Sequence, residues 1–262
     1  MNTSHLPDGE YLHRLADLAD RITLEYYRTE LDIDEKVKPG YTFDPVTQAD
    51  RETELALRAM ISETFPTHGI LGEEFGAAGD TSIQWVIDPI DGTRPYICGI
   101  PVWGTLVGLT QNGHAKIGIM SQPVTGERFW SAGNQSWARW RGNDRLLRSK
   151  QNRSMAAAIL HTNSPDRYPE FPKIAVGKLR KQTRMTRYGG ECYAFAMLAA
   201  GQIDICLELA LQPYDIVALI PIIEQAGGVV SDLNGDRVEA GGHVLASANP
   251  WLHEAALNIL NS

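Results

Sequence analysis

The chain has 262 residues, of which 43% are hydrophobic and 21% are charged, and its 24 basic and 32 acidic side chains leave a net charge of −8. These values indicate one or two globular domains and exclude a disordered chain, a collagen-like fibre and a polytopic membrane protein. The acidic balance argues against nucleic-acid and membrane partners. It does not exclude a phosphorylated substrate, because bound metal ions reverse the local sign of charge.

Three cysteines, Cys98, Cys192 and Cys206, give an odd number with no C-x-x-C spacing, which favours reduced thiols over a disulfide framework or a zinc site. Residues 1–20 show no basic stretch followed by an apolar run, so no signal peptide is predicted. No segment approaches the ~20 apolar residues that a membrane span needs. A cytoplasmic location is therefore expected.

The first part of the chain predicts two helices. Apolar residues recur at three- and four-residue spacing over residues 9–29, which is typical of an amphipathic helix. The polar stretch around Pro39 predicts a mobile loop. A second helix is expected to begin at Thr47 or Asp50 and to end at Phe65, just before a proline.

The pattern then changes to short strands. Residues 69–72 and 83–88 are apolar segments that end in acids, and residues 102–110 and 116–120 predict a strand pair joined by an Asn-Gly turn. Residues 127–140 indicate two further strands.

The remaining sequence predicts a second half that begins with a basic, loop-rich stretch over residues 147–187. It is predicted to contain a strand, a helix, a buried strand and a helix at residues 156–161, 191–200, 203–209 and 213–226. Pro221 lies inside the last helix and should either kink it or mark a break whose position the sequence does not specify. Helices and strands thus mix in an N-terminal α+β half, residues 1–146, and a C-terminal α/β half, residues 147–262, which are expected to pack as one layered unit.

The segment from Trp85 to Thr93 carries the strongest chemical signal. An apolar strand runs into Asp88, and Asp91 follows three residues later, so two carboxylates can converge on one point as hard cations such as Mg²⁺ require. Gly92 lets backbone N–H groups approach an anion, and Thr93 can begin a helix whose N-terminus favours phosphate. The alternative interpretation is an Asp-Gly turn followed by a helix cap.

Three other acids have a functional and a simpler interpretation. Glu73, in a Gly-Glu-Glu segment, alone indicates a solvated acidic turn. Asp215 lies in the first turn of a predicted helix, where an acid also suits the helix dipole, and Asp50 has the same alternative.

Together these segments resemble the inositol monophosphatase superfamily of metal-dependent, lithium-sensitive phosphatases. The matching segments follow the family's order at close to its spacing: V-T-Q-A-D (46–50), G-E-E (72–74), W-V-I-D-P-I-D-G-T (85–93), P-Y-D-I-V-A (213–218) and E-Q-A-G-G (224–228). The resemblance implies an α-β-α-β-α sandwich of the inositol monophosphatase and fructose-1,6-bisphosphatase type, and a homodimer.

The resemblance also implies two or three Mg²⁺ ions per site, with Mn²⁺ as an alternative, held by Glu73, Asp88, the Ile90 carbonyl, Asp91 and Asp215. Asp88 would bridge two ions, and Glu73 would lie near a third, weaker one. Asp50 would orient the Thr93 hydroxyl, which polarises the attacking water, so these two residues and Glu73 form the expected catalytic set. The N–H groups of Gly92 and Thr93 would bind phosphate, and direct attack would form no phosphoenzyme.

Within the superfamily, residues 99–109, 187–201 and 208–224 resemble the histidinol-phosphate phosphatase branch. That branch often has an acid where this chain has Glu191, whereas the inositol-specific branch usually has Gly-Thr-Ala over the equivalent of residues 189–191. The resemblance implies that Gly190, Glu191 and Glu208 bind the alcohol portion of the substrate. The simpler interpretations are a helix N-terminal acid for Glu191 and a strand-end acid for Glu208.

The expected activity is therefore Mg²⁺-dependent hydrolysis of histidinol phosphate to histidinol and phosphate, as in histidine biosynthesis. The alternatives are an inositol-1-phosphate or broad sugar-phosphate phosphatase, a nucleotide 3′-phosphatase, and a module that binds metal and a phosphate metabolite without turnover. Pro95 departs from the Asn-Phe that commonly follows the D-G-T motif. A basic run is interpreted as a solvated face: Arg180, Lys181, Arg184 and Arg187.

Overall fold

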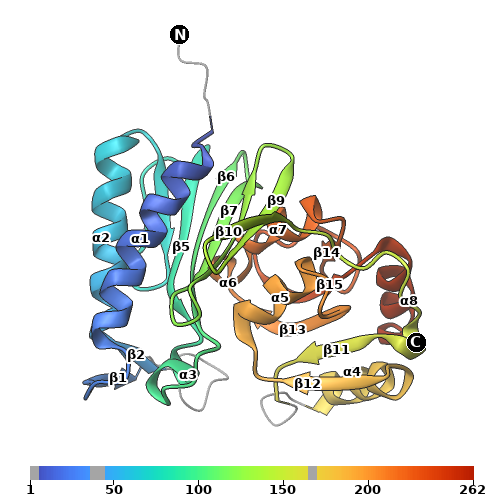
Figure 1. Cartoon of the computed structure of the whole chain (residues 1–262). Coiled ribbons are helices and arrows are strands. Elements are labelled where there is room, and N and C mark those ends of the chain that lie inside the picture. The colour runs from blue at the N-terminus through green and yellow to red at the C-terminus, as the bar shows by residue number, and fades with distance from the viewer. Residues whose placement is uncertain (1–5, 36–44, 165–169) are drawn as a thin grey trace.

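The computed structural model describes residues 6–35, 45–164 and 170–262, so the loop predicted around Pro39 lies outside the described residues. Figure 1 shows alternating layers of helices and sheets. The helical layers are α1 (Gly9–Tyr26) with α2 (Gln48–Thr64), α5 (Glu191–Ala199) with α6 (Pro213–Ile216) and α7 (Leu219–Gln225), and α4 (Glu170–Gln182) with α8 (Pro250–Leu260). This is the α-β-α-β-α sandwich that the sequence predicts.

The larger sheet has eight strands within the described residues, in the order β10-β9-β8-β7-β6-β5-β3-β4. Their bounds are β3 (Gly69–Gly72), β4 (Gly76–Ala78), β5 (Ile83–Asp91), β6 (Gly104–Gln111), β7 (His114–Gln122), β8 (Glu127–Ala132), β9 (Gln135–Trp140) and β10 (Asn143–Leu146). All neighbours are antiparallel except β3 and β5. Asn112 and Gly113 join β6 to β7 with φ of 52° and 78°, as the predicted Asn-Gly turn requires.

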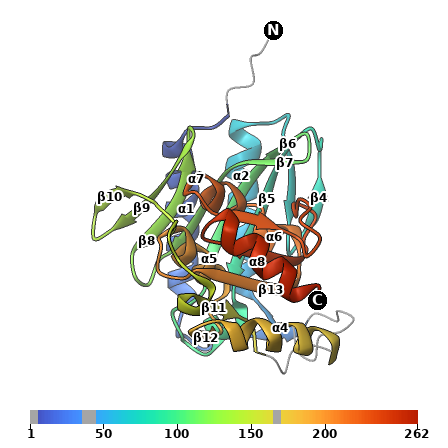
Figure 2. The same cartoon turned by 90° about the vertical axis from the view of Figure 1, so that its right-hand side faces the viewer.

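The smaller sheet has five strands in the described part of the chain, in the order β12-β11-β13-β15-β14. They are β11 (Ile159–Thr162), β12 (Met185–Tyr188), β13 (Ile205–Leu211), β14 (Val229–Ser231) and β15 (Gly242–Ser247). Figure 2 shows α4 and α8 in front of this sheet. A short pair, β1 (Ile33–Glu35) with β2 (Pro45–Thr47), and α3 (Thr93–Ile97) lie below the larger sheet in Figure 1.

One prediction for the second half is wrong, and one of two alternatives is confirmed. The loop-rich stretch contains α4, whose Val176 and Leu179 are buried in the cluster that α8 also joins, and its basic last turn hides this apolar face in the sequence. The helix predicted over residues 213–226 is broken rather than kinked and forms two helices, because Pro221 has no N–H to donate to the carbonyl of Val217. The break leaves α6 as a separate turn that packs against β5.

One apolar core joins the two sheets. Leu106 and Met120 come from the larger sheet, Val244 from the smaller sheet and Ile220 from α7, and all four side chains are buried in one cluster. The larger sheet ends at Leu146, before the smaller one begins. The two halves therefore share one buried cluster where they meet.

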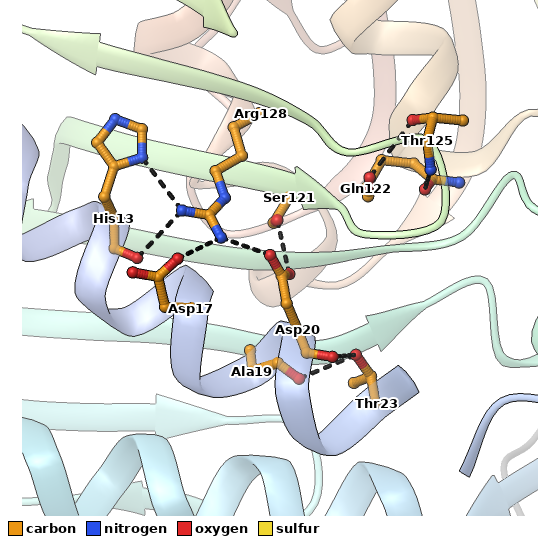
Figure 3. Close-up of polar contacts among 9 residues, drawn as sticks. All are labelled: His13, Asp17, Ala19, Asp20, Thr23, Ser121, Gln122, Thr125 and Arg128. Atoms are coloured by element: carbon orange, nitrogen blue, oxygen red, sulfur yellow. Dashed lines mark hydrogen bonds and ion pairs between the residues drawn. The ribbon is translucent and has the colours of Figure 1, made fainter. Parts of the chain in front are cut away.

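Polar contacts attach α1 to the larger sheet (Figure 3). Arg128 on β8 donates through Nη2 to Asp17 Oδ1 and to Asp20 Oδ2, at 2.6 Å each. Ser121 on β7 donates to the other oxygen of Asp20 at 2.7 Å. Among the described helices, none is long and apolar enough to span a membrane.

Candidate active site

Two of the predicted acids meet at an irregularity in β5. The pairing of β5 with β6 shifts register between Asp88 and Asp91, so the strand runs through Pro89 to residue 91 rather than ending at residue 88 as predicted. Thr105 donates to the carbonyl of Pro89 at 2.7 Å, and the N–H of Ile90 donates to Asp88 Oδ1 at 3.1 Å. A bulge of this kind re-aims side chains, and here it directs two carboxylates to one place.

Asp215 joins these acids from the distant helix α6. The N–H of Gln212 donates to Asp215 Oδ2 at 2.6 Å, which fixes the carboxylate in the first turn. One carboxylate oxygen each from Asp88, Asp91 and Asp215 lies within 4.8 Å of the others. The structure therefore brings together acids that the sequence separates widely.

The chemistry of this cluster fits a divalent cation. Burial raises the pKa of the Asp88 carboxyl well above its usual range, and four neighbouring acids raise it further: Glu73, Asp91, Asp215 and Asp50. A buried carboxylate among like charges is unfavourable unless a cation or a proton compensates it. Several hard oxygen donors at one point are the ligands that Mg²⁺ prefers.

Asp50 lies behind Thr93. It is fully buried at the start of α2, where its Oδ2 accepts the N–H of Thr47 at 2.8 Å and the Thr47 hydroxyl at 2.6 Å. Its Oδ1 accepts the Thr93 hydroxyl at 3.5 Å, and that hydroxyl is also 3.2 Å from the Ile90 carbonyl. The local capping interaction thus leaves one carboxylate oxygen of Asp50 directed at Thr93.

Gly92 allows α5 to approach the turn. Its φ is 90°, in the left-handed region that favours glycine, and it precedes the first residue of α3. A Cβ at this position would lie 3.0 Å from Cγ of Glu191 and 3.1 Å from Cγ of Pro95. Pro95 itself lies in the first turn of α3, where a missing N–H removes no hydrogen bond of the helix.

The other wall of the site comes from α5 and β13. The N–H of Cys192 donates to Asp91 Oδ2 at 2.6 Å, which connects this wall to the acid cluster. Glu208 on β13 is 2% exposed, and its Oε1 lies 3.8 Å from Nδ1 of His161. Burial, together with the nearby charge of Arg187, lowers the pKa of His161 to about 4, so this histidine is neutral near pH 7.

Gly190 packs against the same histidine. A Cβ at Gly190 would lie 2.6 Å from Nε2 of His161 and 3.1 Å from Cβ of Ala194. The glycine is therefore required by close packing at the start of α5.

A cavity of about 120 Å³ connects these elements. The predicted site residues that line it are Glu73, Asp88, Ile90, Asp91, Gly92, Thr93, Glu191, Glu208 and Asp215. Asp50 and Gly190 stand behind that lining, next to Thr93 and His161. Sequence reasoning missed three supporting residues. His161 lies next to Glu208 and Gly190, Thr105 donates to the carbonyl of Pro89, which follows Asp88, and Glu54 accepts the N–H groups of the two residues that follow Glu73. A helical spacing of four residues between Asp50 and Glu54 was the only signal for any of them.

A cluster of acids at a strand end, next to a left-handed glycine turn and a compact cavity between two sheets, defines a metal-dependent phosphomonoesterase. The model of the inositol monophosphatase family matches residues 10–262. The chain belongs to this family.

Individual relatives agree with that assignment. The chain is 36% identical over 258 residues to the chloroplastic bifunctional phosphatase IMPL2 of Arabidopsis thaliana, covering 94% of this chain and 72% of that protein. It is 33% identical over 264 residues to the histidinol-phosphatase of Streptomyces coelicolor, covering 98% of each. A solved inositol monophosphatase from Zymomonas mobilis superposes with a TM-score of 0.84 at 34% identity, covering 97% of both chains.

Proposed function

We propose that the protein hydrolyses histidinol phosphate to histidinol and phosphate. The observation that carries the proposal is that Glu191 and Glu208 line the same cavity as Asp88, Asp91 and Asp215. Histidinol carries an ammonium group and an imidazole, whereas inositol carries only hydroxyls, so carboxylates beyond the acid cluster favour the cationic alcohol. The histidinol-phosphatase of Streptomyces coelicolor, at 33% identity, supports the same choice.

We assign the metal site to the side chains of Glu73, Asp88, Asp91 and Asp215 and to the carbonyl of Ile90. Two or three Mg²⁺ ions, or Mn²⁺ in their place, would acidify a water and neutralise charge on the phosphate when bound. The chain's own groups do the positioning. Asp50 accepts a hydrogen bond from the Thr93 hydroxyl, which leaves the oxygen lone pairs of that hydroxyl to polarise the water.

Phosphate binding is assigned to the turn at the start of α3. The N–H groups of Gly92 and Thr93 are not needed by the helix and are available to phosphate oxygens. No serine, cysteine or histidine nucleophile is part of the motif, so we infer direct attack of water on phosphorus. Retention of configuration at a chiral phosphate would contradict this inference.

We further propose a homodimer in the cytoplasm, as the family resemblance implies. Light scattering during size-exclusion chromatography measures the mass directly. A monomeric mass at assay concentration would contradict the dimer.

The substrate proposal is tested with Glu191→Gln and Glu208→Gln. Each should lower kcat/KM for histidinol phosphate by roughly 10–100-fold, because a hydrogen bond to a charged group is worth ~1.5–3 kcal/mol. Turnover of inositol 1-phosphate should not change beyond error. Glu10→Gln, at an exposed position on α1, is the matched control for the loss of one charge.

Equal losses on both substrates would remove the two acids as selectors of a cationic alcohol. A wild-type protein that prefers inositol 1-phosphate would instead support the inositol-phosphatase alternative.

A further inference from the structure

Glu54 is a fully buried acid on α2, one helical turn after Asp50. Its Oε2 accepts the N–H of Glu74 at 2.7 Å. Its Oε1 accepts the N–H of Phe75 at 3.2 Å and Nε–H of Arg58 at 2.7 Å. A buried carboxylate is stable only with such partners, so the contacts account for a charge inside the protein.

These two backbone N–H groups belong to the loop that carries Glu73. The loop joins β3 to β4, and Gly72 pairs with Gly76 across it. Successive N–H groups that point at one anion form a concave anion site, and here the anion is a side chain of the same protein. Glu73 is bound on its other side as well, because its N–H donates to the carbonyl of Ile87 on β5 at 3.2 Å.

Packing around the carboxylate is equally close. A Cβ at Gly72 would lie 1.9 Å from Oε1 of Glu54, so the carboxylate occupies the space that any side chain at position 72 would need. Arg58 also donates through Nη2 to the carbonyl of Gly76, at the far end of the loop. The loop thus packs closely against α2 at its beginning and is hydrogen-bonded to it in its middle and at its end.

We propose that Glu54 is a positioning residue that holds the Glu73 loop against β5, so that Glu73 and Asp88 face the same cavity. The proposal rests on the proposed role of Glu73 as a metal ligand. Because Asp50 lies one turn earlier on α2, the same helix orients Thr93 and the Glu73 loop together. Glu54 acts through Glu73 and touches neither metal nor substrate.

The direct test is Mn²⁺ binding to the substrate-free protein, measured by electron paramagnetic resonance. Glu54→Gln should weaken binding by roughly 10–100-fold, the usual effect of losing a residue that orients a metal ligand. Gly72→Ala should weaken it too, because the methyl group displaces the carboxylate while the negative charge stays. The two substitutions together should give less than the sum of their separate effects, since both break one contact.

Turnover gives a second measurement that a general loss of stability would not reproduce. In Glu54→Gln, the Mg²⁺ concentration for half-maximal rate should rise in parallel with the loss of Mn²⁺ affinity. KM for the phosphate ester at saturating Mg²⁺ should stay at the wild-type value.

Asp204→Asn is the matched structural control. Asp204 is also fully buried, and it accepts Nε–H of Arg153 at 3.2 Å and the backbone N–H of Ile159 at 2.9 Å, where Glu54 accepts an arginine and two backbone N–H groups. It precedes β13 and contacts no part of the Glu73 loop in these hydrogen bonds. Asp204→Asn should lower the melting temperature and leave Mn²⁺ affinity unchanged.

Three results would overturn the proposal. One is a folded Glu54→Gln or Gly72→Ala protein with wild-type Mn²⁺ affinity. Another is an equal loss of affinity in Asp204→Asn, which would make the effect one of general stability. The third is specific to Glu73: wild-type Mn²⁺ affinity in Glu73→Gln would remove Glu73 as a ligand, whereas a loss there without a loss in Glu54→Gln would reject Glu54 alone.

Discussion

The acid cluster at the end of β5 and the wall formed by α5 and β13 are built from different kinds of contact. In the cluster, four acids each accept a backbone N–H: Asp50 from Thr47, Asp88 from Ile90, Asp91 from Cys192 and Asp215 from Gln212. Three of these donors lie two or three residues away along the chain. The geometry of most of the cluster is therefore a property of short segments.

The wall depends instead on packing between distant segments. His161 on β11 meets Glu208 on β13 because the two strands pair in parallel, and Gly190 meets His161 because α5 packs over that pair. Short segments keep their geometry when a neighbour changes, whereas a packed wall must readjust. We therefore expect substitutions in the cluster to act on the chemistry, and substitutions in the wall to act on stability and substrate fit.

The largest expected effect is that of Asp88→Asn. It removes a charge from the centre of the proposed metal site, where bound cations supply several kcal/mol of stabilisation, so kcat should fall by about a thousandfold or more. Phosphate release at saturating Mg²⁺ measures this loss. Asp17→Asn, on α1, where the carboxylate contacts Arg128 and no acid of the cluster, should retain the wild-type rate (Figure 3).

A substitution in the wall should change the stability of the protein. Gly190→Ala should lower the free energy of unfolding by about 1–3 kcal/mol, because the methyl group would meet the His161 ring at 2.6 Å. Urea unfolding measures this free energy. In a His161→Ala background, Gly190→Ala should lower the free energy of unfolding much less, since the imidazole ring that it would meet is absent. An equal loss of unfolding free energy in both backgrounds would show that the contact between position 190 and His161 does not cause the destabilisation.

The smallest expected effect concerns pH. Burial lowers the pKa of His253, which contacts Ser231 and Ser247, to about 4, below the ~6.5 of an unfolded histidine. Between these values the unfolded chain binds more protons, so stability falls as the pH falls through 6.5 and the full loss is present below 4. The range from pH 7 to pH 5 covers the larger part of this loss.

His161 should contribute a similar loss over the same range, because its pKa is lowered in the same way. Chemical denaturation at both pH values, with a chelator present, measures the sum. His253→Gln should remove only the share of this pH-dependent loss of stability that comes from His253 on α8. A pH dependence that this variant leaves unchanged would contradict the assignment of His253.

The position of the candidate site was predictable because its motifs are local. The motif is an apolar strand that runs into Asp88, then Gly92 in a left-handed turn and Thr93 at a helix start. Its geometry depends mainly on these consecutive residues, so the sequence alone indicates it. The bulge was not predictable, since it depends on pairing with β6 and on the hydrogen bond from Thr105.

The residues that support the site were harder to predict from the sequence. Glu54 resembles any other acid on a charged helix, and only the approach of the β3–β4 loop reveals its partners. The basic last turn of α4 concealed its apolar face in the sequence, and Pro221 indicated a kink or a break between α6 and α7 without giving the position of the break. For Glu54 and for the buried face of α4, the deciding contacts come from segments far away in sequence.

By itself, the sequence determined the layered fold class and the short motifs that carry the acids, because turn chemistry and strand periodicity act over a few residues. The resemblance of those motifs then identified the family. Only the tertiary structure decided which side chains stand behind those motifs: Glu54 under the Glu73 loop and His161 between Gly190 and Glu208. The physical reason is that a buried polar group takes its partners from whichever segments fold around it, and no local pattern specifies them.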